Sequence, residues 1–258
     1  MAPSSLRIGC VQYLNARPLI HGWPGKVIFD HPSTLCARLA AGELDVALVS
    51  SFEFLRNPIY SVVDAVSISS DGPVYSVFVA YADESPLPNI ELDPASQTSV
   101  ALLRSLIAEH GHSFTEAEIA EDRLSPLRSG YARLLIGDQA LRFRQKFADA
   151  YRYWDLGEEW RRIAQIPFVY ALWLVRPEVS DPREIAKELR ARRDENLRNL
   201  DGVIGAVSAF TAEFCQYYYR ECIQFAFGQR EKEGLIAFQH LCEKHEILPP
   251  RILDLRLV

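Results

Sequence analysis

Residues 6–19, LRIGCVQYLNARPL, combine the pattern of a buried strand with a polar turn and the start of a short helix. Leu6 to Val11 have the apolar character of a strand, and Pro18 suits the first turn of the helix that follows. Open α/β sheets bind their ligands in loops beyond the carboxyl ends of the strands. The turn that begins at Tyr13 is therefore a candidate wall of a ligand cleft.

Strand and helix patterns continue to alternate after this turn. Further strands are predicted at 27–29, 45–49, 62–68 and 75–81, with a helix that Pro32 opens between the first two. The polar segment 83–93 contains Pro86 and Pro88 and is typical of a crossing between lobes.

The pattern restarts beyond this segment. Ser96 opens a helix, and strands are predicted at 132–136 and 167–175, where Arg176-Pro177 marks a second crossing. From Asp181-Pro182 onward the sequence is helical, with Asp181 as N-cap.

Two α/β blocks, two crossings and a helical C-terminal region predict an α/β fold of two lobes with a ligand cleft between them. Residues 1–82 and 177–258 would form a discontinuous first lobe, and residues 83–176 the second.

The composition of the chain argues against several classes of function. The 258 residues are 48% apolar, which is enough for a large core, and the net charge of -6 argues against general nucleic-acid binding. The five cysteines form no CxxC pair, as expected for reduced thiols of a cytosolic protein. No export signal and no apolar run of about 20 residues is evident, so we expect a cytoplasmic protein without a membrane partner.

The usual catalytic signatures GxSxG, HExxH and GxxxxGK[ST] are absent. His240 and His245 are five residues apart and do not share a helix face. We therefore expect neither a metal nor an organic cofactor.

The candidate site residues come instead from polar loops. Asn15 can both donate and accept hydrogen bonds, and Arg17 could pair with a carboxylate, although a loop-capping Asn and a solvent-facing Arg explain them equally well. Ser70, Gly72 and Ser76 belong to a loop of small residues that a plain turn explains better.

A helix start with three hydroxyls is the most informative of these loops. Ser96, Thr98 and Ser99 would surround free N–H groups and form an anion site, whereas ordinary capping needs only one hydroxyl. Asp138, after a buried strand, is more often an N-cap, and Phe168 more often belongs to the core.

Seven segments in order resemble the MqnA family of menaquinone biosynthesis, the chorismate dehydratases of the futalosine route. They are YLNARPL (13–19), AAGELDVALVS (40–50), VSISSDGPVYSV (66–77), SQTSVALL (96–103), LLIGDQAL (134–141), DLGEEW (155–160) and PFVYALW (167–173). The resemblance implies a fold like the type II periplasmic binding proteins, used as a cytoplasmic enzyme. It also implies loss of water from chorismate to give 3-[(1-carboxyvinyl)oxy]benzoate.

The resemblance places the family's functional positions on Asn15, Ser76 and the anion site of Ser96, Thr98 and Ser99. We hypothesise that Asn15 is the catalytic residue, which orients the departing hydroxyl while the substrate's own side-chain carboxylate takes the proton. The substrate-binding candidates are Tyr13, Arg17, Ser50, Ser70, Gly72, Ser76, Ser96, Thr98, Ser99, Asp138 and Phe168. The expected partner is the small-molecule substrate alone, with a homodimer left open.

The three residues before PFVYALW depart from the family pattern. The family has Thr-Gly-Leu before PFVYALW, whereas this chain has Ala164-Gln165-Ile166, a change expected at the cleft mouth that bears on the exact substrate. One alternative is a non-catalytic cytosolic binder or sensor of a small aromatic or carboxylate anion, because fold alone does not fix function. The other is a sister enzyme of the same pathway that acts on a larger aromatic acid.

Overall fold

Four strands from the first 70 residues and a fifth from much later in the chain build the first sheet. They are β1 (Ile8–Cys10), β2 (Val27–Phe29), β3 (Val46–Ser50), β4 (Ser61–Ser70) and β10 (Phe168–Val175). Their order is β2-β1-β3-β10-β4, with β10 antiparallel to both of its neighbours. The computed structural model describes residues 6–82, 89–93 and 96–258.

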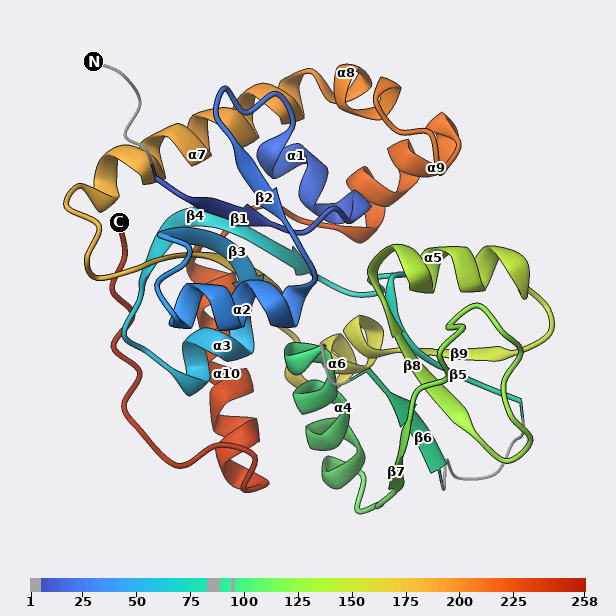
Figure 1. Ribbon diagram of the computed structural model, residues 1–258. Helices are drawn as coiled ribbons and strands as arrows, with labels where there is room; N and C mark the ends of the chain where they lie inside the picture. Colours follow the sequence, from blue (N-terminus) through green and yellow to red (C-terminus); the bar gives the residue numbers. More distant parts are fainter. Residues whose placement is uncertain (1–5, 83–88, 94–95) are drawn as a thin grey trace.

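The second sheet is built from the middle of the chain. Its strands are β5 (Val77–Tyr81), β6 (Asn89–Leu92), β7 (Thr115–Glu118), β8 (Ala132–Ile136) and β9 (Arg152–Asp155), in the order β7-β6-β8-β5-β9. The two sheets form separate lobes that lie side by side (Figure 1).

Helices cover both faces of the first sheet (Figure 1). One face carries η1 (Leu14–Ala16), α1 (Arg17–Ile20), α7 (Pro182–Arg198), α8 (Leu200–Gly205), α9 (Ala212–Tyr217) and η2 (Tyr218–Cys222). The other carries α2 (Pro32–Ala40), α3 (Ser51–Arg56) and α10 (Gln229–Lys244). None of the helices in the described ranges combines the length and apolarity that a membrane span requires.

The second sheet is covered by α4 (Gln97–Glu109), α5 (Gly137–Lys146) and α6 (Leu156–Ala164). The helix predicted from Ser96 is therefore confirmed as α4, and the predicted strand 132–136 as β8. The predicted start of α7 is also confirmed, because Asp181 accepts a hydrogen bond from the backbone N–H of Glu184 at 3.1 Å.

Two strands lie in the opposite sheet from the one that the expected lobe boundaries imply. β5 pairs with β8 and β9, although it precedes residue 83, and β10 pairs with β3 and β4, although it precedes residue 177. The segment predicted as the first crossing contains β6, and its residues 83–88 lie outside the described residues. An apolar run predicts a strand but not its partners, so we propose instead that the second lobe spans residues 77–164.

Candidate active site

A pocket lies between the two lobes, at the ends of β1, β3 and β4 and at the N-termini of α4 and α5. It holds about 650 Å³ of empty space, part of it open to solvent. The lining residues are Val11, Tyr13, Asn15, Pro32, Leu48, Val49, Ser50, Ile68, Val74, Ser76, Val77, Ser96, Gln97, Thr98, Ser99, Ile136, Gly137, Tyr170, Ala171 and Ile223. Small-molecule sites occur preferentially where domains meet.

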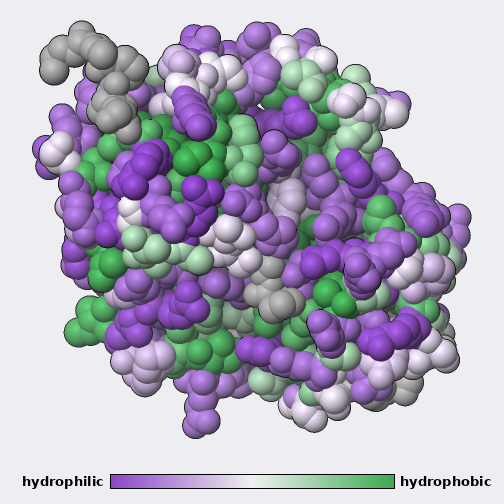
Figure 2. Space-filling model, viewed as in Figure 1, coloured by the Kyte–Doolittle hydropathy of each residue, from purple (hydrophilic) through white to green (hydrophobic). Residues whose placement is uncertain are grey.

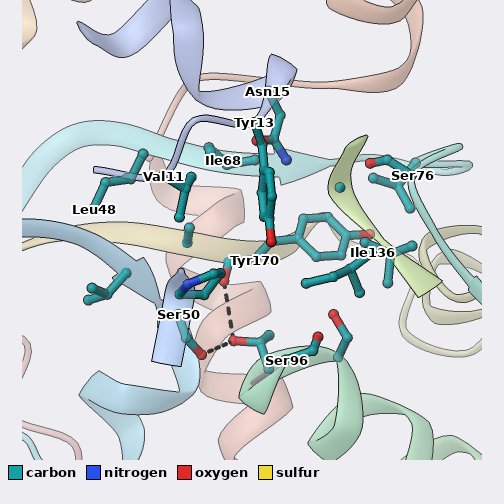
Figure 3. A pocket seen from close by; sticks show the side chains of 18 of the residues that line it. Val11, Tyr13, Asn15, Leu48, Ser50, Ile68, Ser76, Ser96, Ile136 and Tyr170 are labelled. Carbon is teal, nitrogen blue, oxygen red and sulfur yellow. Dashed lines mark hydrogen bonds between the residues drawn. The ribbon is translucent and has the colours of Figure 1, made fainter. Parts of the chain in front are cut away.

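The turn after β1 forms one wall, which we call the Asn15 wall (Tyr13 to Asn15). In Figure 3 the side chains of Tyr13 and Asn15 enter the pocket from the side opposite Ser96. The side-chain oxygen Oδ1 of Asn15 is buried and has no hydrogen-bond partner among the described residues. It is therefore placed to accept a hydrogen bond from a ligand.

The ring of Tyr13 packs against the backbone of Gly137 in the other lobe. A Cβ atom at Gly137 would come within 2.8 Å of the ring, and Gly137 has a φ of 56°. Glycine suits this position because both the close approach and the left-handed backbone exclude larger residues. Burial raises the pKa of the Tyr13 hydroxyl to about 12, so this group remains a neutral donor at physiological pH.

The start of α4 forms the opposite wall, which we call the α4 wall (Ser96 to Ser99). The backbone N–H groups of its first turn have no partner within the helix. The side chains of Ser96 and Ser99 are buried, and none of the hydrogen bonds described for this protein uses their hydroxyls. This wall therefore offers hydrogen-bond donors at the positive end of a helix, as an anion requires.

Thr98 has a different role within the α4 wall. Its hydroxyl forms a hydrogen bond with the Ser50 hydroxyl, accepts one from the backbone N–H of Phe52 at 3.2 Å and donates to the carbonyl oxygen of Tyr170 at 3.2 Å. All three partners belong to the first lobe. Thr98 and Ser50 line the pocket, but their hydroxyls chiefly connect the lobes.

Ser76 lines the pocket where the chain enters the second lobe. Its hydroxyl accepts a 2.6 Å hydrogen bond from Tyr218 of η2. The preceding residues are fixed by the buried carboxylate of Asp155, which accepts the N–H groups of Val74 and Tyr75 at 3.1 and 2.7 Å and also caps α6. Burial raises the pKa of Asp155, whereas these backbone donors act against that rise.

Several predicted site residues lie outside the pocket lining. The Ser70 hydroxyl donates to the carbonyl oxygen of Gly72 at 3.0 Å within the turn after β4. Phe168 is fully buried and packs against Trp160 and Phe238. These contacts match the alternatives that we weighed, a plain turn and a core aromatic.

Arg17 and Asp138 line a larger, open groove, which Tyr13 also borders. Figure 2 shows a largely hydrophilic face that is hollowed where the lobes meet. Arg17 donates to the carbonyl oxygen of Ala206 at 3.1 Å. The Asp138 carboxylate accepts the N–H of Leu14 at 2.7 Å and makes no cap of its own helix.

Two polar side chains of the lining, those of Gln97 and Tyr170, were not among the predicted site residues. Gln97 stands among the hydroxyls of the α4 wall, and its buried oxygen Oε1 has no partner among the described residues. Tyr170 contributes its ring to the pocket, and burial raises the pKa of its hydroxyl, which bonds to Ser70 at 3.0 Å. The position of Gln97 among the hydroxyls of SQTS and the place of Tyr170 in the aromatic run 168–173 were the signals that could have indicated these two residues.

The segment 164–166 lies at the end of α6 and not among the residues that line the pocket. Gln165 caps this helix with a φ of 59°, a conformation in which helices commonly use glycine. The departure at this position therefore concerns a helix end, and the expectation that it lies at the mouth of the cleft is wrong.

The side chains that line the pocket are uncharged. None of its described lining residues carries an Asp, Glu, His, Lys or Arg side chain. In the described ranges, no group of three or more His, Cys, Asp or Glu residues is arranged to hold a metal ion. The lining can donate and accept hydrogen bonds, but its ionisable groups are tyrosines with raised pKa values.

Comparison with known proteins identifies the family of this chain. A model of the family described as menaquinone biosynthesis matches residues 6–244. The chain belongs to this family. A chorismate dehydratase of Thermus thermophilus is 30% identical over 221 residues, which are 77% of this chain and 80% of that protein. The family predicted from the seven segments is thus confirmed.

Solved structures of distant proteins share the fold. A protein from Archaeoglobus fulgidus gives a TM-score of 0.74 at 16% identity, with 94% of this chain and 98% of that one covered. A Candida albicans protein described as having the generic periplasmic binding protein fold gives 0.69 at 13% identity, with 98% and 95% covered. The predicted two-lobed, periplasmic-binding-protein-like α/β fold is confirmed.

Proposed function

We propose that this protein is a chorismate dehydratase, a carbon–oxygen lyase that removes water from chorismate to give 3-[(1-carboxyvinyl)oxy]benzoate. Membership of the menaquinone biosynthesis family and the similarity to the Thermus thermophilus enzyme support this proposal. The observation that carries it is the buried, unpartnered Asn15 oxygen, which lies across the pocket from the donors of the α4 wall.

The polar groups of chorismate match the two walls. Chorismate carries two carboxylates and one ring hydroxyl. We assign one carboxylate to the hydroxyls of Ser96 and Ser99 and the N–H groups beside them, because a helix N-terminus stabilises negative charge. The ring hydroxyl then donates to Asn15, while Tyr13 supplies a neutral donor for the second carboxylate.

The neutral lining explains how the proton is handled. The reaction breaks a ring C–H bond, forms a C=C bond and breaks the neighbouring C–O bond, so that the ring becomes aromatic. With no acidic or basic side chain among the described lining residues, we assign the proton first to the substrate's side-chain carboxylate. It then passes to the departing hydroxyl, which leaves as water. Aromatisation drives the reaction, so the protein chiefly supplies orientation.

Turnover of purified protein with chorismate tests the proposal. We expect a new aromatic ultraviolet absorbance and a product lighter than chorismate by one water, without added metal or cofactor. Tight binding of another aromatic acid without turnover of chorismate would contradict the proposal and favour a sensor or a sister enzyme.

We also propose that the reaction takes place in the cytoplasm. The cysteines are all buried and free, which suits a reducing compartment. A homodimer, and the absence of a nucleic-acid partner, remain predictions.

A further inference from the structure

We propose that Asp138 and Tyr219 are positioning residues, which fix Asn15 in the cleft by holding both backbone polar groups of the preceding Leu14. We call this arrangement the Leu14 clamp. Its role in catalysis rests on the proposed dehydratase function, whereas its structural part can be tested without any substrate.

The clamp consists of two short hydrogen bonds from different lobes. The N–H of Leu14 donates to Oδ1 of Asp138 at 2.7 Å, and the hydroxyl of Tyr219 donates to the carbonyl oxygen of Leu14 at 2.8 Å. Asp138 lies in the first turn of α5 in the second lobe, whereas Tyr219 lies in η2 of the first lobe. The residue next to Asn15 is therefore held from both sides of the cleft.

Burial makes the clamp costly to break. Leu14 is only 1% exposed and Tyr219 only 5%, so water cannot easily replace the Tyr219 hydroxyl, whereas Asp138 is partly exposed at the open groove. A buried backbone group without a partner is strongly disfavoured, and the turn would have to shift to satisfy it. Since Leu14 opens the short helical turn that carries Asn15, such a shift would move the Asn15 amide.

The surroundings of Asp138 favour this role over direct contact with substrate. Its side chain lies outside the pocket lining and makes no helix cap. The positive charges that act on it are those of Arg142 and Arg17, which oppose the rise in its pKa caused by burial. The adjacent Gly137 packs under the Tyr13 ring, so one corner of the second lobe holds both residues before Asn15.

Three variants and a control test the clamp. Asp138→Ala should lower kcat for chorismate about 10-fold or more with KM changed less than about 3-fold, because a misplaced catalytic group slows the chemical step. Asp138→Asn should recover most of that loss, since its amide oxygen can accept the same N–H. Tyr219→Phe removes the other hydrogen bond of the clamp, to the Leu14 carbonyl oxygen, and should lower kcat in the same way. Asp181→Ala is the matched control, because this exposed Asp caps α7 far from the cleft.

Hydrogen exchange supplies a readout without substrate. The Leu14 amide should exchange at least about 10-fold faster in Asp138→Ala than in the wild type or Asp181→Ala, because its acceptor is lost. If the wild type does not turn over chorismate, the dehydratase proposal fails and this exchange rate still decides whether the clamp exists.

Other outcomes would overturn the clamp. Unchanged exchange at Leu14 in Asp138→Ala would do so, as would full kcat in a folded Tyr219→Phe. Equal loss of kcat in Asp138→Asn and Asp138→Ala would show that the negative charge matters and not the acceptor for Leu14. If Asp138→Ala does not fold, Tyr219→Phe alone decides.

Discussion

The two walls of the pocket offer opposite hydrogen-bonding groups. The Asn15 wall presents a buried amide oxygen without a partner, which accepts a hydrogen bond. The α4 wall presents the hydroxyls of Ser96 and Ser99 beside the free N–H groups of a helix start, which donate. A molecule that carries both a hydroxyl and a carboxylate is therefore held in one orientation across the cleft.

Each wall also has one residue whose hydrogen bonds connect the lobes. On the Asn15 wall it is Leu14, through its backbone bond to Asp138. On the α4 wall it is Thr98, through its bonds to the first lobe. The groups next to these residues are the ones left for a ligand. In each wall, neighbouring residues therefore divide the two roles of connecting the lobes and binding the ligand.

Removal of the acceptor from the Asn15 wall should give the largest effect. In Asn15→Ala we expect kcat for chorismate to fall about 100-fold or more, because the hydroxyl is no longer oriented for departure. Steady-state kinetics and calorimetric titration should show that chorismate still binds with a Kd within about 3-fold of the wild type, since the α4 wall is intact. Full activity with unchanged binding would remove Asn15 from its catalytic role.

Removal of a donor from the α4 wall should act on binding. In Ser99→Ala we expect KM to rise about 10-fold with a smaller change in kcat, because a hydrogen bond to a charged group contributes about 1.5–3 kcal/mol. Ser96→Ala should show the same direction of change. The assignment of a carboxylate to this wall fails if neither substitution raises KM.

Loss of the connecting hydroxyl on the α4 wall should act mainly on stability. In Thr98→Val we expect the free energy of unfolding, measured in urea, to fall by about 1–3 kcal/mol, because buried partners lose their hydrogen bonds. KM should change less than in Ser99→Ala. Ser105→Ala is a suitable control on the same helix, since the Ser105 hydroxyl donates only within α4, to the Ala101 carbonyl, apart from a weak contact with Cys242. A large rise in KM without loss of stability would place Thr98 among the binding groups.

The sequence predicted the elements of the fold better than their partners. Hydrophobic patterns located the strand 132–136 and the helix that follows Ser96, because these signals are local. They could not show that β10 returns to the first sheet, since this depends on pairing between residues 98 to 129 positions apart.

The residues of the candidate site could also be predicted from the sequence better than their contacts. The hydroxyls at 96–99 outnumber what a helix cap needs, and the structure places all of these residues in the lining of the pocket. Sequence could not show that Thr98 is occupied by contacts with the first lobe or that Asp138 bonds to Leu14. Both facts depend on how the lobes meet, which no local pattern encodes.

The dependence of kcat/KM on pH tests most directly the claim that chorismate loses water in a pocket of neutral protein groups. Burial raises the pKa of Tyr13 to about 12 and also raises that of Tyr170, so both hydroxyls stay protonated as pH rises through the neutral range. We therefore predict a flat profile between about pH 6 and pH 9, with the substrate already a dianion throughout. A bell-shaped profile or an inflection in this interval would show that a side chain acts as acid or base and would contradict the account.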